Sequence, residues 1–273
     1  MDFTPSARII CDSVAPFGDR LTTMVVTLHR YMLPEFNTHR AFSRNSASSR
    51  AIPVRKTLAT VADTPAVPTR WRSERKGMQG GPEIAEPGKA RDIWLAARDD
   101  AVNRVEQLLQ LGVHKSIVNR LLEPFLPHTV IVSATNWTGF WEQRCNPDAQ
   151  DDIRVAAEAM AEAYEQSTPT YVKAKEWHLP FLNDYEREHL NGWEQRAVST
   201  ARCARVSYLT HDGRRDLAAD IELFQRLVTA NPPHASPLEH VAVPAAGFER
   251  TTEALWPSNY TGWIQLRHLS FGR

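Results

Sequence analysis

Glu35-Phe-Asn-Thr-His-Arg-Ala-Phe-Ser-Arg-Asn-Ser-Ala-Ser-Ser-Arg50 is a run of cationic and short polar side chains within a chain of 273 residues. Three arginines and one histidine lie among four serines, and no acidic residue occurs between Glu35 and Asp63. Guanidinium groups bind phosphate through paired, charge-assisted hydrogen bonds, and hydroxyl and amide groups add short neutral donors. The run therefore predicts a site for a phosphorylated molecule, although solvated loops can have the same composition.

The order of the polar residues favours the first interpretation. The run His39-Arg40-x-x-Ser43-x-Asn45-x-x-Ser48-x-Arg50 resembles the signature of flavin-dependent thymidylate synthases, R-H-R-x-x-S-x-N-E-x-S-x-R-Y, at six polar positions. Thr38, Ser46 and Ala51 stand where that signature has arginine, glutamate and tyrosine. These three departures leave flavin binding as an expectation to be tested.

Two later segments are similar to the same family. Asn119-Arg120-Leu-Leu-Glu-Pro-Phe resembles the helix that carries a nucleotide-binding arginine, and Arg120 is the matching position. The segment from Arg144 to Gln150 keeps the arginine-to-glutamine interval of the motif L-R-x-x-x-x-A-Q-W-E-I. The resemblance implies that Arg144 grips and polarises the pyrimidine ring.

A fourth segment occurs in an unexpected place. His234-Ala-Ser-Pro-Leu-Glu-His240 resembles the flavin-binding motif H-x-[ST]-P-F-E-H, which ordinary members carry before the signature, after a strand similar to Ala204-Arg-Val-Ser-Tyr208. The chain is therefore predicted to be a circular permutation of the family, a change that proteins tolerate when their termini lie close together. From the residues alone, Ser236 also suits a helix N-cap and Pro237 a first helical position, with His234 and His240 as ordinary structural histidines.

The resemblance implies a single domain over residues 1–273, with the signature and nucleotide-binding part at 20–165 and the permuted flavin-binding segment at 199–242. It implies reductive methylation of dUMP to dTMP in a homotetramer with active sites at subunit interfaces. The cofactors would be FAD, NADPH and 5,10-methylene-tetrahydrofolate. No G-x-G-x-x-G or G-x-x-x-x-G-K-[ST] motif offers another way to hold a nucleotide.

Carried over position by position, the resemblance implies roles for individual residues. Cofactor binding falls to His39, Arg40, Asn45, Ser48, His234, Ser236 and Glu239. Substrate binding falls to Glu35, Ser48, Arg50, Arg120 and Arg144. Arg144 is also the expected catalytic residue, because a fixed guanidinium beside a developing oxyanion favours the enolate-like ring whose C5 attacks the carbon donor.

Two alternatives remain open. Glu35 stands where the family usually has glutamine, and a carboxylate accepts hydrogen bonds but donates none unless it is protonated. It would suit the amino group of cytosine, so a methylase or hydroxymethylase acting on dCMP or dUMP is one alternative. A noncatalytic nucleotide- or RNA-binding protein is the other, but a simple anion-binding protein has no need of the segment from His234 to His240.

Composition sets further bounds. Lysine plus arginine equals aspartate plus glutamate at 32 each, so no overall positive field favours binding to nucleic acid polymers. The three cysteines lack metal-site spacing, and no histidine cluster predicts a metal site. No apolar run predicts a membrane span and the N-terminus does not resemble a signal peptide, so we expect a cytoplasmic protein.

The periodicity predicts an α+β fold with helices packed on a small mixed or antiparallel sheet. We expect strands at 20–33 and 128–134, and helices at 90–111, from about 114 through Arg120, after 136 through Arg144, and at 148–166. Residues 61–90 are expected to form a long ordered loop near the site, and residues 170–198 a connecting segment or lid.

Overall fold

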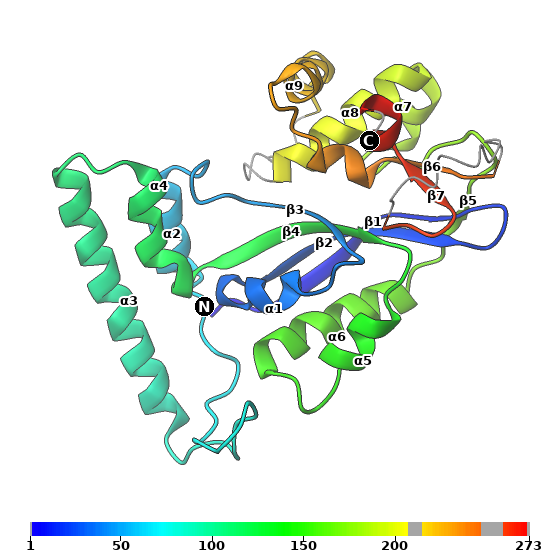
Figure 1. The fold of residues 1–273 in the computed structure, drawn as a ribbon. Coiled ribbons are helices and arrows are strands. Elements are labelled where there is room, and N and C mark those ends of the chain that lie inside the picture. Colours follow the sequence, from blue (N-terminus) through cyan, green and yellow to red (C-terminus); the bar gives the residue numbers. More distant parts are fainter. Residues whose placement is uncertain (1, 207–214, 247–258, 272–273) are drawn as a thin grey trace.

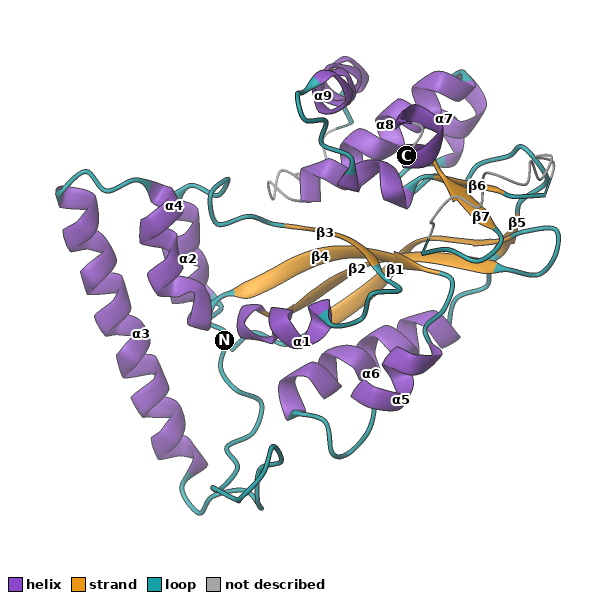
Figure 2. Ribbon diagram, viewed as in Figure 1, coloured by secondary structure: helices purple, strands orange, loops and turns teal. Residues whose placement is uncertain are grey.

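The computed structural model describes residues 2–206, 215–246 and 259–271. Its centre is a five-stranded mixed sheet with the strand order β3-β4-β2-β1-β5 (Figure 1). The strands are β1 (Ser6–Val14), β2 (Arg20–His29), β3 (Ser43–Ser46), β4 (Pro127–Ala134) and β5 (Thr170–Tyr171). Neighbours are antiparallel except β5, which runs parallel to β1. Helices surround this sheet, so the predicted α+β class is confirmed (Figure 2).

Strand β2 lies in the middle of the sheet and is shorter than the sequence predicted. The expected strand ran to residue 33, but β2 ends at His29 and is followed by the 3-10 turn η1 (Arg30–Met32) and the short helix α1 (Leu33–Asn37). Pro34 explains the difference, because proline has no N–H for a sheet ladder and favours the first turn of a helix. The signature is therefore preceded by a short helix and not directly by a strand.

One face of the sheet is covered by α5 (Thr138–Arg144) and α6 (Asp151–Glu165) (Figure 1). The predicted helix at 148–166 is confirmed as α6, and Ile153, Ala156 and Met160 on its inner face are fully buried against β1 and β2. The side chain of Gln150 caps the helix by accepting from the backbone N–H groups of the first turn. The predicted strand at 128–134 is β4, and the predicted helix through Arg144 is α5.

A second group of helices stands at the end of the sheet where β4 begins (Figure 1). It consists of α2 (Val54–Asp63), α3 (Pro87–Gln110), α4 (Lys115–Val118) and the 3-10 helix η2 (Asn119–Phe125). The predicted helix at 90–111 is confirmed as α3. The loop predicted at 61–90 is shorter, because α2 extends to Asp63 and α3 begins at Pro87. Arg120 lies on η2 and not on an α-helix, because Pro124 removes a helical donor and disfavours α geometry at the residue before it.

The opposite face of the sheet carries the C-terminal elements (Figure 1). They are α7 (Asp184–His189), α8 (Gly192–Arg205), α9 (Leu217–Thr229), η4 (Ser236–His240), β6 (Ala242–Pro244), β7 (Trp263–Gln265) and α10 (Leu266–Phe271). Residues 170–198 thus contain α7 and the start of α8, each opened by an asparagine capping box. The strand expected at Ala204–Tyr208 is wrong for Ala204 and Arg205, which end α8, while Ser207 and Tyr208 lie outside the described residues.

Five buried polar side chains connect this C-terminal layer to the sheet. Ser13 Oγ lies 2.8 Å from His178 Nδ1, and His178 Nε2 lies 2.8 Å from Thr23 Oγ1. Ser133 Oγ continues the chain, 2.6 Å from Thr23 Oγ1 and 2.8 Å from His240 Nδ1. Burial lowers the pKa of both His178 and His240 to about 3, so both imidazoles are neutral. The network joins β1, β2 and β4 to η4.

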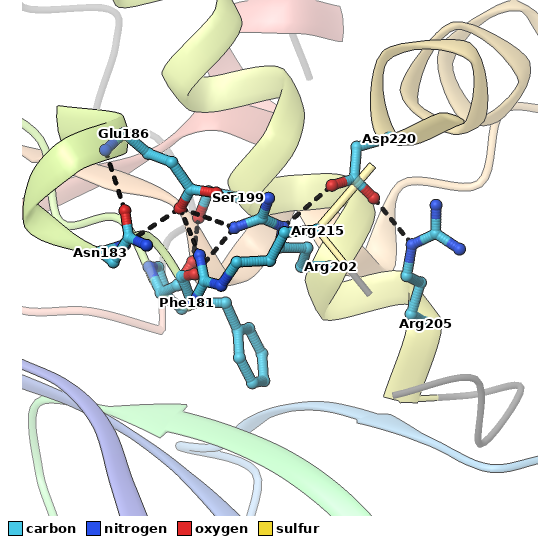
Figure 3. Close-up of polar contacts among 9 residues, drawn as sticks. Phe181, Asn183, Glu186, Ser199, Arg202, Arg205, Arg215 and Asp220 are labelled. Atoms are coloured by element: carbon cyan, nitrogen blue, oxygen red, sulfur yellow. Dashed lines mark hydrogen bonds and ion pairs between the residues drawn. The ribbon is translucent and has the colours of Figure 1, made fainter. Parts of the chain in front are cut away.

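Ion pairs hold α7, α8 and α9 together (Figure 3). The guanidinium of Arg202 donates to Glu186 Oε1 at 2.7 Å on α7 and to Asp220 Oδ2 at 2.9 Å on α9. Arg205 also donates to Asp220, and Arg215 also donates to Glu186. Arg202 is 4% exposed and Asp220 is 1% exposed, so water does not compete for this central pair.

The Glu186 carboxylate predicts a specific loss of stability in acid. Burial alone would raise the pKa of Glu186, but hydrogen bonds from Arg202, Asn183 and Arg215 lower it from 4.5 to about 2. Between about pH 4.5 and pH 2, Glu186 is therefore protonated in the unfolded chain and ionised in the folded chain. The free energy of unfolding consequently falls across that window as the pH decreases. We expect Glu186→Gln to flatten this fall in urea denaturation measured at several pH values. An unchanged slope would contradict the assignment, and Glu222→Gln, on the exposed face of α9, is the control.

Candidate functional site

Arg144 is the last residue of α5 and is fixed by residues of the signature. Its Nε donates to His39 Nε2 at 2.9 Å, and its Nη2 contacts Thr38 Oγ1 at 3.2 Å and the Glu35 carbonyl at 3.4 Å. Its Nη1 makes no hydrogen bond to any described residue. Arg144 therefore lies beside His39 and the Glu35 backbone within one chain, and its Nη1 has no partner among the described residues.

The imidazole of His39 is suited to orienting this arginine. Burial, followed by the charges of Arg144 and Arg44, lowers the pKa of His39 to about 4. The neutral ring accepts from Arg144 through Nε2, so its proton is on Nδ1. Phe140 packs edge-on at a centroid distance of 4.8 Å and restricts the ring further. A protonated His39 would lose the acceptor and repel Arg144.

Thr38, which stands where the signature has arginine, takes part in the hydrogen bonds around Arg144. Its hydroxyl donates to the Glu35 carbonyl at 2.7 Å and accepts from Arg144. An arginine at this position would place a second guanidinium beside Arg144 and remove that acceptor. Threonine therefore stabilises the observed orientation of Arg144.

A hollow of about 330 Å³ opens beside this cluster. Its lining includes Thr38, His39, Arg40, Asn136 and Gln143. Arg40 is exposed, and no carboxylate pairs with its guanidinium among the residues that the structure describes. The hollow thus presents a cation and several neutral polar groups, which suit an anionic ligand.

Glu35, whose backbone carbonyl contacts Arg144, has an unusual side chain. Its Oε2 is buried and has no hydrogen-bond partner within the described residues. A buried carboxylate oxygen without a partner is costly, and a ligand donor at this position would offset that cost. The resemblance names Glu35 as a substrate contact, and its Oε2 is an acceptor that no residue in the described part of the chain satisfies.

Asn45, Ser236 and Glu239 meet where η4 packs against β3. Ser236 Oγ donates to Asn45 Oδ1 at 3.2 Å, so the expected N-cap role of Ser236 is wrong and Ala235 precedes the helix instead. Glu239 forms an ion pair with Arg267 at the start of α10. The permuted segment and the signature, far apart in sequence, are therefore in contact.

The two histidines of that segment differ. His240 is fully buried and belongs to the core, as the structural interpretation allowed. His234 has an exposed side chain near Ser236, and its backbone N–H donates to the Leu227 carbonyl at 2.9 Å. His234 is therefore accessible to a ligand, whereas His240 supports the segment from behind.

Ser48, Arg50 and Arg120 form a separate group at the other end of β3. Asn119, beside Arg120, donates to the backbone carbonyls of Ser49 at 2.8 Å and of Ile52 at 2.9 Å. This contact docks the turn that carries Ser48 and Arg50 onto η2. Both of those side chains and Arg120 face solvent.

Glu123 is a central residue of this group that sequence reasoning missed. Its Oε1 accepts from Arg30 Nη2 at 2.8 Å, from Ser49 Oγ at 2.5 Å and from Arg120 Nη1 at 2.9 Å. The Glu123 carboxylate therefore holds both Arg120 and the turn that carries Ser48 and Arg50. Its place three residues after Arg120 was the available signal, because that spacing brings two side chains together on one helix face.

The two cationic groups lie at opposite ends of β4. Arg120 precedes the start of the strand, and Arg144 follows its end. Eight strand residues span roughly 25 Å, which exceeds the length of a nucleoside monophosphate. One chain therefore does not bring all the predicted substrate residues together.

Residues 17–170 match the family described as thymidylate synthase complementing protein. That range is more than half of the chain and contains the signature, Arg120 and Arg144. The chain belongs to this family. A search of curated proteins found no match.

Two solved structures have a fold similar to that of this member of the thymidylate synthase complementing protein family. The UMP/dUMP methylase PolB from Streptomyces cacaoi, bound with 5-Br UMP, has a TM-score of 0.50 at 16% identity over 61% of this chain and 90% of that chain. The same protein bound with 5-Br dUMP has a TM-score of 0.50 at 15% identity over 60% and 92%. At such identities the likeness shows a shared fold.

The family match ends before the segment from His234 to His240. A displaced segment would have this effect, so the circular permutation stays a prediction that the contact between η4 and β3 supports. Among the described residues, no cluster of three or more histidine, cysteine or acidic side chains could hold a metal ion. No described helix has both the length and the apolar composition needed to cross a bilayer.

Proposed function

We propose that this chain is a flavin-dependent methylase of dUMP, which forms dTMP with 5,10-methylene-tetrahydrofolate as carbon donor and NADPH as reductant. The observation that carries the proposal is the fixed guanidinium of Arg144 beside a neutral His39 within the family signature. The Nη1 group of Arg144, which has no partner among the described residues, would bond the pyrimidine oxygen and stabilise negative charge there, making C5 nucleophilic. No side-chain nucleophile is needed for this reaction.

The residues that the resemblance assigns to the cofactor have side chains suited to a flavin dinucleotide. Arg40 and His234 are exposed, and Asn45 and Ser236 present neutral polar groups. The carboxylate of Glu239 is neutralised by Arg267, so it would not repel a pyrophosphate. These residues would hold FAD, which when bound supplies the reducing equivalents for the transferred carbon.

We also propose that the active site is completed by another copy of the chain, within a homotetramer. Arg144 and Arg120 lie at opposite ends of β4, yet the resemblance gives both to one nucleotide. Two chains could satisfy both contacts, with Arg144 at the base and with Ser48, Arg50 and Arg120 of a second chain at the phosphate. Dissociated protein should then bind dUMP weakly.

The proposal is tested by reconstitution and product mass. Purified protein is incubated with FAD, freed of excess, and examined for retained flavin absorption bands. The loaded protein then receives dUMP, methylene-tetrahydrofolate and NADPH, and we expect product with the mass and retention of dTMP. A hydroxymethylated product would show that the enzyme is a hydroxymethylase and not a methylase. A protein that retains no flavin would favour the noncatalytic nucleotide- or RNA-binding protein.

A cytosine nucleotide is a second candidate substrate, favoured by the buried Oε2 of Glu35. The amino group of cytosine could donate to this oxygen, whereas the corresponding carbonyl of uracil would be repelled by it. Competition between dCMP and dUMP in one reaction separates the two. Glu35→Gln should shift any preference for dCMP towards dUMP, because glutamine can also donate.

Glu123 gives a test of the proposed phosphate end. Its negative charge lies beside Arg120, so Glu123→Gln should strengthen binding of dUMP or inorganic phosphate about threefold at low salt, less at high salt. Glutamine retains an acceptor for Ser49, which keeps the turn in place. Affinity is measured by titration calorimetry at two salt concentrations, with Glu222→Gln as control. Weaker phosphate binding would show instead that the Glu123 charge is needed to hold the turn.

A further inference from the structure

A cavity among the C-terminal helices lies outside the range that matches the family. Its volume is about 350 Å³. It is lined by Trp177, Trp193, Arg196, Phe224, Leu266, Leu269 and Ser270. Two indoles, one phenyl ring and one guanidinium thus meet at a site separate from the signature and its hollow. Binding sites for small molecules combine apolar and aromatic walls with few polar groups in this way.

Arg196 is the charged group of this cavity, and its environment is unusual. Its Cζ lies 4.9 Å from the centroid of the Trp177 ring, a cation–π contact. Burial lowers the pKa of Arg196, and no carboxylate pairs with it among the described residues. A partly desolvated guanidinium without an anion is costly, and a bound anion would offset that cost.

The aromatic walls are also incompletely covered. The Trp193 side chain is 45% exposed, and its ring meets that of Phe224 edge-on at a centroid distance of 6.1 Å. Leu269, which also lines the cavity, is 40% exposed. These side chains present open apolar area next to the cation. Their combination selects for a ligand with both a flat apolar part and a negative charge.

We propose that this cavity binds a small molecule in which a flat aromatic ring carries a carboxylate or phosphate group. The ring packs against Trp193 and the apolar wall, and the anion pairs with Arg196. This site is independent of the proposed methylase activity, because it uses none of the residues assigned to dUMP or FAD. Neither half of such a ligand would suffice, since a lone ring leaves Arg196 without an anion and a lone anion leaves the walls open.

The test uses 2-naphthoate as the complete probe, with 2-naphthalenemethanol and acetate as its two halves. Titration calorimetry on the full chain should show binding of 2-naphthoate and much weaker binding of either half. Arg196→Gln should lower the affinity about tenfold, the effect of losing one charge-assisted contact. Arg226→Gln, on the exposed face of α9, is the matched control and should leave the affinity unchanged.

Trp193→Ala is a second variant, chosen because the exposed indole can be removed with little effect on folding. It should weaken 2-naphthoate binding and leave the circular dichroism spectrum unchanged. Equal binding to the parent chain and to both variants would overturn the proposal. A concentration-dependent dimer that Trp193→Ala abolishes, with no probe binding, would also overturn it and identify the cavity as a contact between copies.

A second arm distinguishes the two sources of the anion. AMP replaces 2-naphthoate in the same titration and supplies a phosphate on an aromatic nucleoside. AMP binding that Arg196→Gln removes supports the cavity and extends it to phosphates. If Arg40→Gln removes AMP binding and Arg196→Gln does not, AMP binds at the hollow beside Arg40 and not in this cavity. That result, together with absent 2-naphthoate binding, would refute the proposal.

Discussion

Arg144→Lys is expected to lower the turnover of dUMP by about a hundredfold to a thousandfold, the usual effect of removing one preorganised donor to a developing oxyanion. Lysine retains the positive charge but cannot donate to His39 and the pyrimidine at once, because its ammonium is a single point on a flexible stem. The measurement is the single-turnover rate with FAD-loaded protein. The fold should be intact, since Arg144 lies at the surface end of α5.

The control for this variant is Arg104→Lys on α3, whose guanidinium bonds only Gln107, at 3.1 Å, among the residues that the structure describes. It should turn over dUMP at the parental rate. A turnover for Arg144→Lys equal to that of the control would remove Arg144 from the mechanism. If dUMP affinity fell while the single-turnover rate at saturation stayed unchanged, Arg144 would be a binding group and not a catalytic one.

Arg202→Ala is expected to lower the free energy of unfolding by about 3–5 kcal/mol, because it leaves the buried Asp220 carboxylate without its main partner. Glu186 loses its two bonds from Arg202 in the same change (Figure 3). Urea denaturation followed by tryptophan fluorescence measures the loss. Arg226→Ala removes an exposed pair with Glu222 and should cost less than about 1 kcal/mol.

A double variant separates the charge effect from the loss of packing. Asp220→Asn combined with Arg202→Ala leaves no buried charge on α9, so we expect the pair of changes to cost less than the sum of the two single changes. Additive losses would mean that the arginine stem, and not the ion pair, holds α8 to α9.

Periodicity predicted the elements whose packing is local. The apolar positions of α3 and α6 recur at helical spacing, and β4 reads as a short buried run, so each was placed within a few residues. The end of β2 was misplaced because large apolar and aromatic residues continue past His29, with Tyr31, Met32 and Leu33. The proline at position 34, which cannot join a sheet ladder, was a stronger signal than that composition.

The candidate site was predictable residue by residue but not as an arrangement. The signature located His39 and the segment from Arg144 to Gln150 located Arg144, yet the bond between them joins residues far apart in sequence and depends on the fold. Glu123 was missed because its importance comes from three donors on different elements, two of them distant in sequence. The ion pair of Arg267 with Glu239 could not be predicted from the sequence, because the two residues become adjacent through the pairing of β6 with β7.

The buried network from Ser13 to His240 limits where this chain can be truncated without losing contacts of the sheet. The family match ends at residue 170, which would suggest that the matched part could be produced alone. A chain cut there would lose His178 and His240, and the hydroxyls of Thr23 and Ser133 would lose their imidazole partners. The boundary of the recognisable family is therefore not a boundary of a folding unit, and gene fragments for expression should keep the C-terminal layer with the sheet.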